Sequence, residues 1–527
     1  MPNWRKRIKI ASLLAAGILL AAPVVTFAAW LICQRHLQSK CDEKIAEIKA
    51  AGHPVTWLEL EKLYPPLPPG KQNAADIYEK AFAAMEKVKD QVYDPDNRWK
   101  TDASSSKEGK INLELVPIAG TAHEPKTVGA EIPKKILEES QRYLDLNKEA
   151  LAEAENAVKL KHCRFPIDFS LGYKMKLWHL PGINKLHKLV LLDALIAAER
   201  GDSAHAFRSL MNSYRTAEAV SGEPISFSKL VELQLLQRSI SFSRDIITKA
   251  GFGKVELLAL QQKALELESS TLPLKMATIS TCIIYIDYRQ STSSFWNKFS
   301  NKNRIGSSEI EHNRYKSAWL CLREKNEIKL FSDFKELIES LELPFDERLA
   351  KFHSIQDRWE YLNDMDEDSF LGVGFLKGNA SLVIKQAALI SLLRAERAAL
   401  AVELYRIENG KFPESLGDLV PQYMAELPQD PFNKGQPLRY KSFTLTRRVG
   451  SGVEDMRIEE DAYAVYGCAA NGKDYGDKDA LNLFSTGSEH GICFGAKTTV
   501  CEEEIQRRRE ALIPPAWRKA EELPKSR

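Results

Sequence analysis

The sequence lacks the short motifs by which common catalytic and metal sites are recognised. HExxH, GxSxG and the phosphate-binding P-loop are all absent, which excludes the protein classes that these motifs define. The eight cysteines form no CxxC pair, which excludes the usual zinc-ribbon and thioredoxin arrangements. A net charge of +2, with both signs interspersed, gives no basic surface for nucleic acid. The sequence therefore nominates no catalytic residue and no nucleic-acid partner.

The length of the chain bounds its organisation. At 527 residues it is too long for a single compact core, and two or three domains are expected. We predict a mainly α protein with four parts: an anchor over 1–36, a helical domain over 37–375, a small α+β domain over 376–500 and a charged tail over 501–527. A subdivision of the helical domain near 165–180 is left open.

The N-terminus carries the pattern of a membrane anchor. Four Lys or Arg residues lie between positions 5 and 9, and an uncharged run follows from Ile10 to Cys33. That run of about 24 residues is roughly 36 Å long as a helix, enough to span a bilayer core of roughly 30 Å. Trp30 lies near its outer end, where an aromatic ring suits the membrane interface. A single transmembrane helix is therefore expected.

The charge asymmetry predicts the orientation of this helix. Basic residues stay on the cytoplasmic side, so the chain after about residue 36 is expected outside the inner membrane. A cleavable signal peptide is the alternative, with Thr26–Ala28 as a small-x-small cleavage site. Because the apolar run continues past that site and exceeds the usual core of a signal peptide, an uncleaved anchor is favoured.

The region after the anchor has the pattern of successive amphipathic helices. They are expected near 133–161, 183–200, 203–220, 226–250, 254–269, 311–341 and 346–364. Gly201-Asp202 and Gly251 supply turns between neighbouring helices. The pair over 183–220 resembles one tetratricopeptide-type hairpin, but no period of about 34 residues recurs. Packed hairpins are therefore predicted, and a repeat array is not.

A long amphipathic helix opens the C-terminal region. Apolar residues recur at helical spacing from Leu382 to Tyr405. Five charged residues are expected on its other faces: Arg394, Glu396, Arg397, Glu403 and Arg406. These charges argue against a second membrane span. Asn409-Gly410 supplies a left-handed stop to the helix, and Pro413 prevents its continuation.

The stretch that begins with this helix resembles the C-terminal domain of type II secretion major pseudopilins. The resemblance covers about residues 385–480: a helix exit of Asn-Gly-x-x-Pro form, a Pro-x-Asp-Pro-aromatic turn, a tyrosine-bearing strand and a Gly- and Asp-rich loop. The matching positions are Asn409, Gly410, Pro413, Pro428, Asp430, Pro431, Phe432, Gly435, Tyr440, Tyr466, Asn471, Gly472 and Asp474. The resemblance implies one long helix docked on a small antiparallel sheet, with an acidic loop at the edge.

The N-terminus departs from that family. A pseudopilin begins with a short leader, a Gly before a Phe or Met, and a Glu in the following apolar helix, and the run over 10–33 has neither the cleavage motif nor the glutamate. We therefore expect a pseudopilin-like domain on a different scaffold, neither processed nor polymerised as a pilin.

The acidic loop of the pseudopilin family binds calcium, and the resemblance extends this expectation to Asn471, Asp474, Asp477 and Asp479. Their oxygen ligands suit Ca²⁺. The family's Gly pair is reduced here to Gly476 followed by Asp477, and the spacing is not that of an EF-hand. An acidic turn closed by Asx hydrogen bonds, with no ion, is the alternative.

Three cysteines near the C-terminus are disulfide candidates, because this region is expected outside the cytoplasm: Cys468, Cys493 and Cys501. With His490 they also form a candidate zinc-ligand set, in which His490 and Cys493 make an HxxC pair. Unpaired thiols are the third alternative.

Three classes of function stay open. The leading hypothesis is a single-pass envelope protein whose helical scaffold presents the pseudopilin-like domain to other envelope proteins, in an interaction or structural role related to secretion-type machinery. The second is an extracytoplasmic hydrolase, for which no catalytic pair stands out. The third is a helical module that binds peptides in a groove between its hairpins.

Overall fold

A computed structural model describes residues 3–93, 109–118, 132–270, 274–292, 322–360, 367–433, 435–449, 456–468 and 493–494. In parts of these ranges, among them 3–20, 443–449 and 456–462, it describes the backbone without the side chains.

The described chain is mainly α-helical, as predicted. Its helices are α1 (Asn3–Ala50), α2 (Trp57–Glu61), α3 (Ala74–Val88), α4 (Lys134–Leu146), α5 (Lys148–Ala157), α6 (His179–Glu199), α7 (Ser203–Glu218), α8 (Ser226–Ala250), α9 (Lys254–Ser270), α10 (Leu274–Thr292), α13 (Leu322–Ser340), α14 (Phe345–Glu360) and α15 (Glu367–Asn409). Short 3-10 helices are η1 (Lys89–Gln91), η2 (Leu113–Leu115), η3 (Phe169–Lys174) and η4 (Leu416–Leu419). The strands are β1 (Val92–Tyr93), β2 (Ile111–Asn112), β3 (Arg439–Val449), β4 (Met456–Tyr466) and β5 (Cys493–Phe494).

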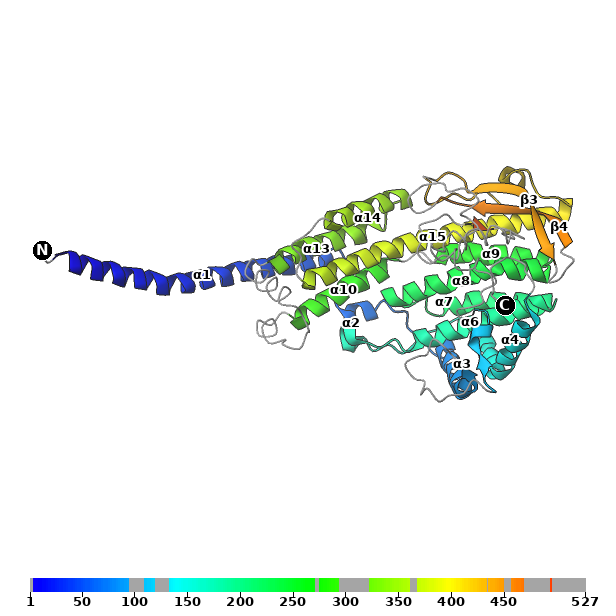
Figure 1. The fold of residues 1–527 in the computed structure, drawn as a ribbon, viewed down its shortest axis with the longest axis horizontal. Coiled ribbons are helices and arrows are strands. Elements are labelled where there is room, and N and C mark those ends of the chain that lie inside the picture. The colour runs from blue at the N-terminus through cyan, green and yellow to red at the C-terminus, as the bar shows by residue number, and fades with distance from the viewer. Residues whose placement is uncertain are drawn as a thin grey trace, which may run out of the picture.

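Helix α1 has two halves with different surroundings. Its second half packs against α13 and buries Cys41 and Ile48, which are 0% and 1% exposed. Its first half projects from the rest of the molecule (Figure 1), and Val24 and Ile32 there are 67% and 70% exposed. The apolar run over 10–33 lies in this projecting half. Among the residues that the structure describes with their side chains, which exclude 3–20, no helix is long and apolar enough to cross a membrane.

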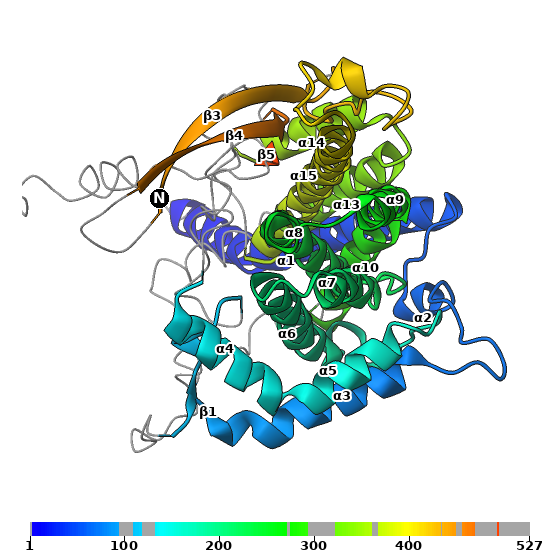
Figure 2. The same cartoon turned by 90° about the vertical axis from the view of Figure 1, so that its right-hand side faces the viewer.

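The remaining helices pack side by side into a helical body, defined here as α2 to α15 (Figure 2). Helices α6 and α7 form the predicted hairpin, with Gly201 at φ +75° in its turn. Pro181 does not delay the start of α6, because proline is tolerated in the first turn of a helix, where its missing N–H has no partner to lose. A side chain at Gly182 would meet the Phe82 ring at 2.9 Å, so this glycine allows α6 and α3 to pack closely.

The helix predicted over 133–161 is divided in two. Asn147 lies between α4 and α5 with φ −102° and ψ 15°, and its side-chain Nδ2 donates to the carbonyl of Tyr143 at 2.9 Å. Asparagine competes with the helical backbone in this way, which explains the break inside a pattern of continuous helical periodicity.

Helix α15 is central to the body, and contacts α8, α9, α10, α13 and α14. Five of its alanines are fully buried, and their small side chains allow neighbouring helices to approach: Ala387, Ala395, Ala398, Ala399 and Ala401. The domain boundary expected at 375/376 falls inside this continuous helix.

A small antiparallel sheet packs on the C-terminal part of α15. Strands β3 and β4 pair along their length, from Arg439 opposite Tyr466 to Val449 opposite Met456, and β5 adds two residues to β4. The sheet lies at the opposite end of the molecule from the start of α1 (Figure 1). The predicted arrangement of a long helix on an antiparallel sheet is confirmed. A two-residue parallel pair, β1 and β2, lies elsewhere in the chain.

Candidate functional site

A buried carboxyl group lies in the middle of α15. Glu396 was expected on a polar face of this helix, and that expectation is wrong: the residue is 1% exposed and lies among α7, α8 and α15. Glu403, expected on a polar face as well, is 8% exposed. The neighbouring Arg394 and Arg397 agree better with the expectation, since both reach Glu268 of α9, at 2.7 and 2.6 Å.

One oxygen of the Glu396 carboxyl accepts two short hydrogen bonds. The Tyr214 hydroxyl of α7 and the Ser243 hydroxyl of α8 both donate to its Oε1, each at 2.6 Å. Its Oε2 has no hydrogen-bond partner among the described residues. Burial raises the pKa of Glu396 to about 7, and the hydrogen bonds from Ser243 and Tyr214 oppose that shift. The group is therefore poised between its neutral and ionised forms near neutral pH.

A second buried polar chain lies one turn away on α8. His187 Nε2 of α6 lies 2.8 Å from Ser239 Oγ, which lies 2.9 Å from Ser213 Oγ of α7. Burial lowers the pKa of His187 well below its usual value, and the positive charges of Arg238 and Lys188 act in the same direction. The imidazole is therefore held neutral.

The spacing of the sequence contained a signal for the buried glutamate. Glu396 follows Leu392 by four positions and precedes Ala399 by three, so it falls on the apolar stripe of the helix. Glu396 was expected on a polar face because its side chain is charged, although its position lies on the apolar stripe. Nothing in the sequence indicated the partners, because Tyr214 and Ser243 are more than 150 positions away from it.

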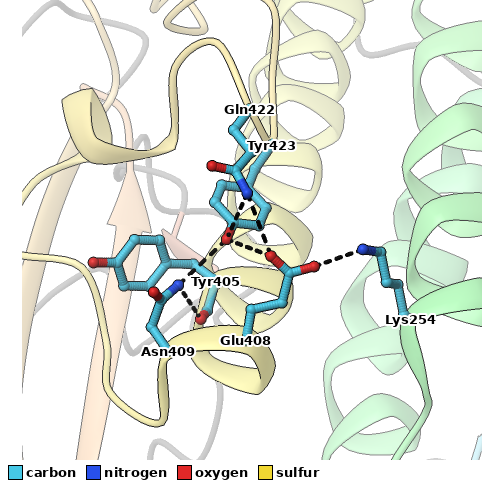
Figure 3. A network of polar contacts seen from close by, with 6 residues as sticks. All are labelled: Lys254, Tyr405, Glu408, Asn409, Gln422 and Tyr423. Atoms are coloured by element: carbon cyan, nitrogen blue, oxygen red, sulfur yellow. Dashed lines mark hydrogen bonds and ion pairs between the residues drawn. The ribbon is translucent and has the colours of Figure 1, made fainter.

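A second glutamate of α15, Glu408, lies at the exposed C-terminal end of the helix (Figure 3). Glu408 accepts a hydrogen bond from the Tyr423 hydroxyl at 2.7 Å and forms an ion pair with Lys254 of α9 at 2.6 Å. The nearby Asn409 amide donates to the Tyr405 carbonyl at 2.9 Å and lies 3.3 Å from the Tyr423 hydroxyl. These contacts connect α15 to α9 and to the loop that follows η4.

The predicted stop of α15 is present at Gly410, and two tyrosines of the sheet form hydrogen bonds to α15 and to the segment that follows it. Gly410 has φ +71° and donates its N–H to the Arg406 carbonyl at 2.9 Å, which is the expected left-handed stop. The Pro413 carbonyl accepts a hydrogen bond from the Tyr440 hydroxyl of β3 at 3.0 Å. The Tyr463 hydroxyl of β4 donates to the Ala399 carbonyl at 3.0 Å and so connects the sheet to α15.

Asp430 closes the turn that contains Pro431. It is 1% exposed, and its two carboxylate oxygens accept from the N–H groups of Phe432 and Cys468, at 2.9 and 2.6 Å. A Cβ at Gly467 would lie 2.9 Å from Ser391 Oγ and 3.0 Å from Asp430 Oδ1, so a larger residue would displace these side chains where the end of β4 passes the turn. The aspartate therefore joins the turn to the strand that ends at Tyr466.

Most of the other predicted site residues lie outside the described residues, and Cys468 and Cys493 lie within them. Gly472 and the four calcium candidates, Asn471, Asp474, Asp477 and Asp479, lie outside the described residues, as do His490 and Cys501. Cys468 is a buried free thiol 3.1 Å from an Arg439 nitrogen, and burial raises its pKa. Cys493 is described in its backbone, opposite Tyr466 in the sheet. The disulfide and calcium expectations stay predictions. Within the described ranges, no group of three acidic, His or Cys side chains could hold a metal ion.

Two further clusters among the described residues contain a histidine beside a carboxylate. Asp193 Oδ2 lies 2.7 Å from His205 Nε2 and accepts a hydrogen bond from Ser209 Oγ at 2.5 Å, so the serine donates its proton to the carboxylate rather than to the imidazole. His179 and Glu223 are both buried with Nε2 and Oε1 2.7 Å apart, but these atoms are not aligned for a hydrogen bond. Neither cluster has the geometry of a catalytic triad.

Comparison with known proteins adds no relative to this picture. No protein-family model, no curated protein sequence and no solved structure matches the chain.

Proposed function

We propose that this chain is a single-pass inner-membrane protein of the cell envelope, in which a helical body presents a pseudopilin-like domain to other envelope proteins. The observation that carries the proposal is the contrast between the halves of α1. An apolar helix that projects from its own protein with Val24 and Ile32 mostly exposed needs an apolar environment, and a bilayer is the one that the basic N-terminus favours.

The attachment of α1 to the body supports this role. Gln34, one residue after the apolar run, donates a hydrogen bond to Glu324 of α13 at 3.3 Å. Further along, Arg289 of α10 bridges Glu327 of α13 and Asp42 of α1, at 2.8 and 3.1 Å. A helix held in this way has no flexible spacer, so the body would stand directly on the outer face of the membrane.

The position of the sheet supports a presenting role. It lies at the far end of the molecule from the N-terminus of α1 (Figure 1), where it would face away from the bilayer. The left-handed stop at Gly410 and the turn closed by Asp430 are consistent with the resemblance to pseudopilins.

The anchor can be tested by placing charge in the apolar half of α1. Each charged residue near the centre of a span costs about 2.5–3.5 kcal/mol of insertion. We expect V24K combined with V25K to release the full chain from membranes under alkaline extraction. The matched control is Leu58→Lys, at an exposed leucine of α2 that is 60% exposed, which should leave the protein in the membrane fraction. Equal extraction of both variants would contradict the proposal.

The orientation is tested separately with protease added to spheroplasts. A C-terminal epitope should be lost from spheroplasts and retained in intact cells. Protection in both would place the helical body in the cytoplasm.

The calcium site is tested by thermal denaturation of the full chain with calcium and with chelator. Calcium should raise the melting temperature, and Asp474→Asn combined with Asp477→Asn should abolish the difference. An identical melting temperature in calcium and chelator would favour the ion-free acidic turn.

A further inference from the structure

The surroundings of Glu396 contain features that favour its ionised form and features that favour its neutral form. Two short hydroxyl donors on Oε1 stabilise an ionised carboxylate, because charge-assisted O–H···O⁻ bonds are stronger than neutral ones. Complete burial, and an Oε2 that has no partner within the described part of the chain, stabilise the neutral carboxyl, because a buried charge that lacks compensation costs far more than a buried dipole. A structural glutamate would be expected to have a cation beside it.

The charged groups near Glu396 are engaged elsewhere. On its own helix, Arg394 and Arg397 pair with Glu268 of α9. Among the described residues, the groups that face the carboxyl are the Tyr214 hydroxyl from α7 and the Ser243 hydroxyl from α8, and the causes of its pKa shift are burial and these two hydrogen bonds. On α8 the next residues, Arg244 and Asp245, are buried as well and carry opposite charges.

We propose that Glu396 is a proton-operated latch: the neutral carboxyl holds α15 against α7 and α8, and loss of its proton to solvent loosens that helix. The latch would act on the sheet as well, because the Tyr463 hydroxyl is bonded to the Ala399 carbonyl only three positions further along α15. The C-terminal domain would then be held more loosely at alkaline than at acid pH. This inference does not depend on the membrane anchor or on the resemblance to pseudopilins.

The size of the effect follows from the two pKa values of the group. With a pKa of about 7 in the closed helix and the ordinary value of 4.5 in an opened one, opening becomes about thirty-fold more favourable between pH 5.5 and pH 8.5.

The test is hydrogen exchange of the α15 amides in the full chain at pH 5.5 and pH 8.5, corrected for the intrinsic pH dependence of exchange. Wild type should lose about thirty-fold protection between the two pH values. Glu396→Gln, which mimics the neutral carboxyl, should be as protected at pH 8.5 as at pH 5.5. Glu408→Gln, the matched change on the surface of the same helix, should retain the wild-type loss. Equal pH dependence in wild type and Glu396→Gln would overturn the proposal.

The protonation state of Glu396 can also be measured directly by infrared spectroscopy, and this measurement does not depend on the stability of the helix. The infrared difference between wild type and Glu396→Gln should contain the carbonyl band of a neutral carboxyl at pH 5.5, replaced by carboxylate bands at pH 8.5. Tyr214→Phe removes a hydrogen bond that lowers the pKa of Glu396, so its transition should move to higher pH. A carboxylate band at pH 5.5, or a transition that Tyr214→Phe leaves unmoved, would contradict the latch.

Discussion

Two glutamates on the same helix are placed in opposite environments. Glu396 and Glu408 both accept a hydrogen bond from a tyrosine hydroxyl, at 2.6 and 2.7 Å. Glu396 is buried away from water and no cation among the described residues pairs with it, whereas Glu408 lies at the surface beside Lys254. Burial raises the pKa of Glu396, and the hydrogen bonds and charge from Lys254 and Tyr423 lower that of Glu408.

The comparison shows that similar hydrogen-bond partners do not determine what a carboxyl contributes. Solvent screens the Glu408 interactions and competes for each of its partners, so such a pair contributes little to stability. Removing a partner inside the body leaves a polar group that no water can reach, which is costly. A tyrosine–glutamate hydrogen bond is therefore expected to contribute to stability at the buried Glu396 and to be replaceable at the exposed Glu408.

Removing the carboxyl itself should separate the two sites most clearly. Glu396→Ala leaves the Tyr214 and Ser243 hydroxyls without their acceptor and opens a cavity. We expect the free energy of unfolding to fall by about 4 kcal/mol. Glu408→Ala, measured in the same denaturant titration of the full chain, should leave the transition midpoint almost unchanged. Similar losses for the two variants would refute the distinction.

The stability of the protein should depend on pH because burial shifts the pKa values of Glu396 and His187. Between pH 4.5 and about 7 the unfolded state has lost the Glu396 proton and the folded state retains it, so stability falls as pH rises, by about 3 kcal/mol. His187 acts with the opposite sign, because its lowered pKa makes stability fall as pH drops below 6.5.

The two contributions overlap and partly offset each other in wild type. They can be separated by comparing His187→Gln with the double variant that also carries Glu396→Gln. The difference between their stability curves from pH 4.5 to pH 7 should contain the glutamate contribution alone. A difference that does not vary with pH would show that folding does not raise the pKa of Glu396.

Removing one tyrosine hydroxyl at each site should give a smaller effect of the same kind. Tyr214→Phe deletes one of the two donors to Glu396 and should cost about 1 kcal/mol of unfolding free energy. Tyr423→Phe deletes the donor to Glu408 and should leave the melting temperature unchanged within error, because water replaces the hydroxyl. A larger loss from Tyr423→Phe than from Tyr214→Phe would reverse the comparison.

The smallest expected effect is that of Glu408→Gln. It removes the ion pair with Lys254 and keeps the shape of the side chain. We expect no measurable shift of the melting temperature, and no change in the response to added salt beyond the loss of this one screened pair. A clear loss of stability would show that the contact between α9 and the end of α15 depends on this charge.

Much of the architecture could be predicted from local sequence features. Helices α8 and α9 were expected over 226–250 and 254–269, and they span Ser226–Ala250 and Lys254–Ser270. Gly251 ends α8 at φ +60°, as a left-handed glycine should. These features involve interactions between residues a few positions apart, which is why periodicity and stop signals predict them.

Other features could not be predicted in the same way. The break at Asn147 is also local, but a helical periodicity continuous over 133–161 concealed it. The boundary expected near residue 375 falls within α15 because a single helix serves both the body and the sheet. A change in composition along a chain does not reveal whether one helix packs against two partners.

The sequence by itself determined where helices such as α8 and α9 begin and end and the stop at Gly410, because short-range hydrogen bonds and backbone preferences act within a few residues. Only the tertiary structure decided which charged side chains of α15 are removed from water and which half of α1 finds a partner. Burial depends on the surfaces that distant segments contribute, and the desolvation it imposes is what distinguishes Glu396 from Glu408 on the same helix.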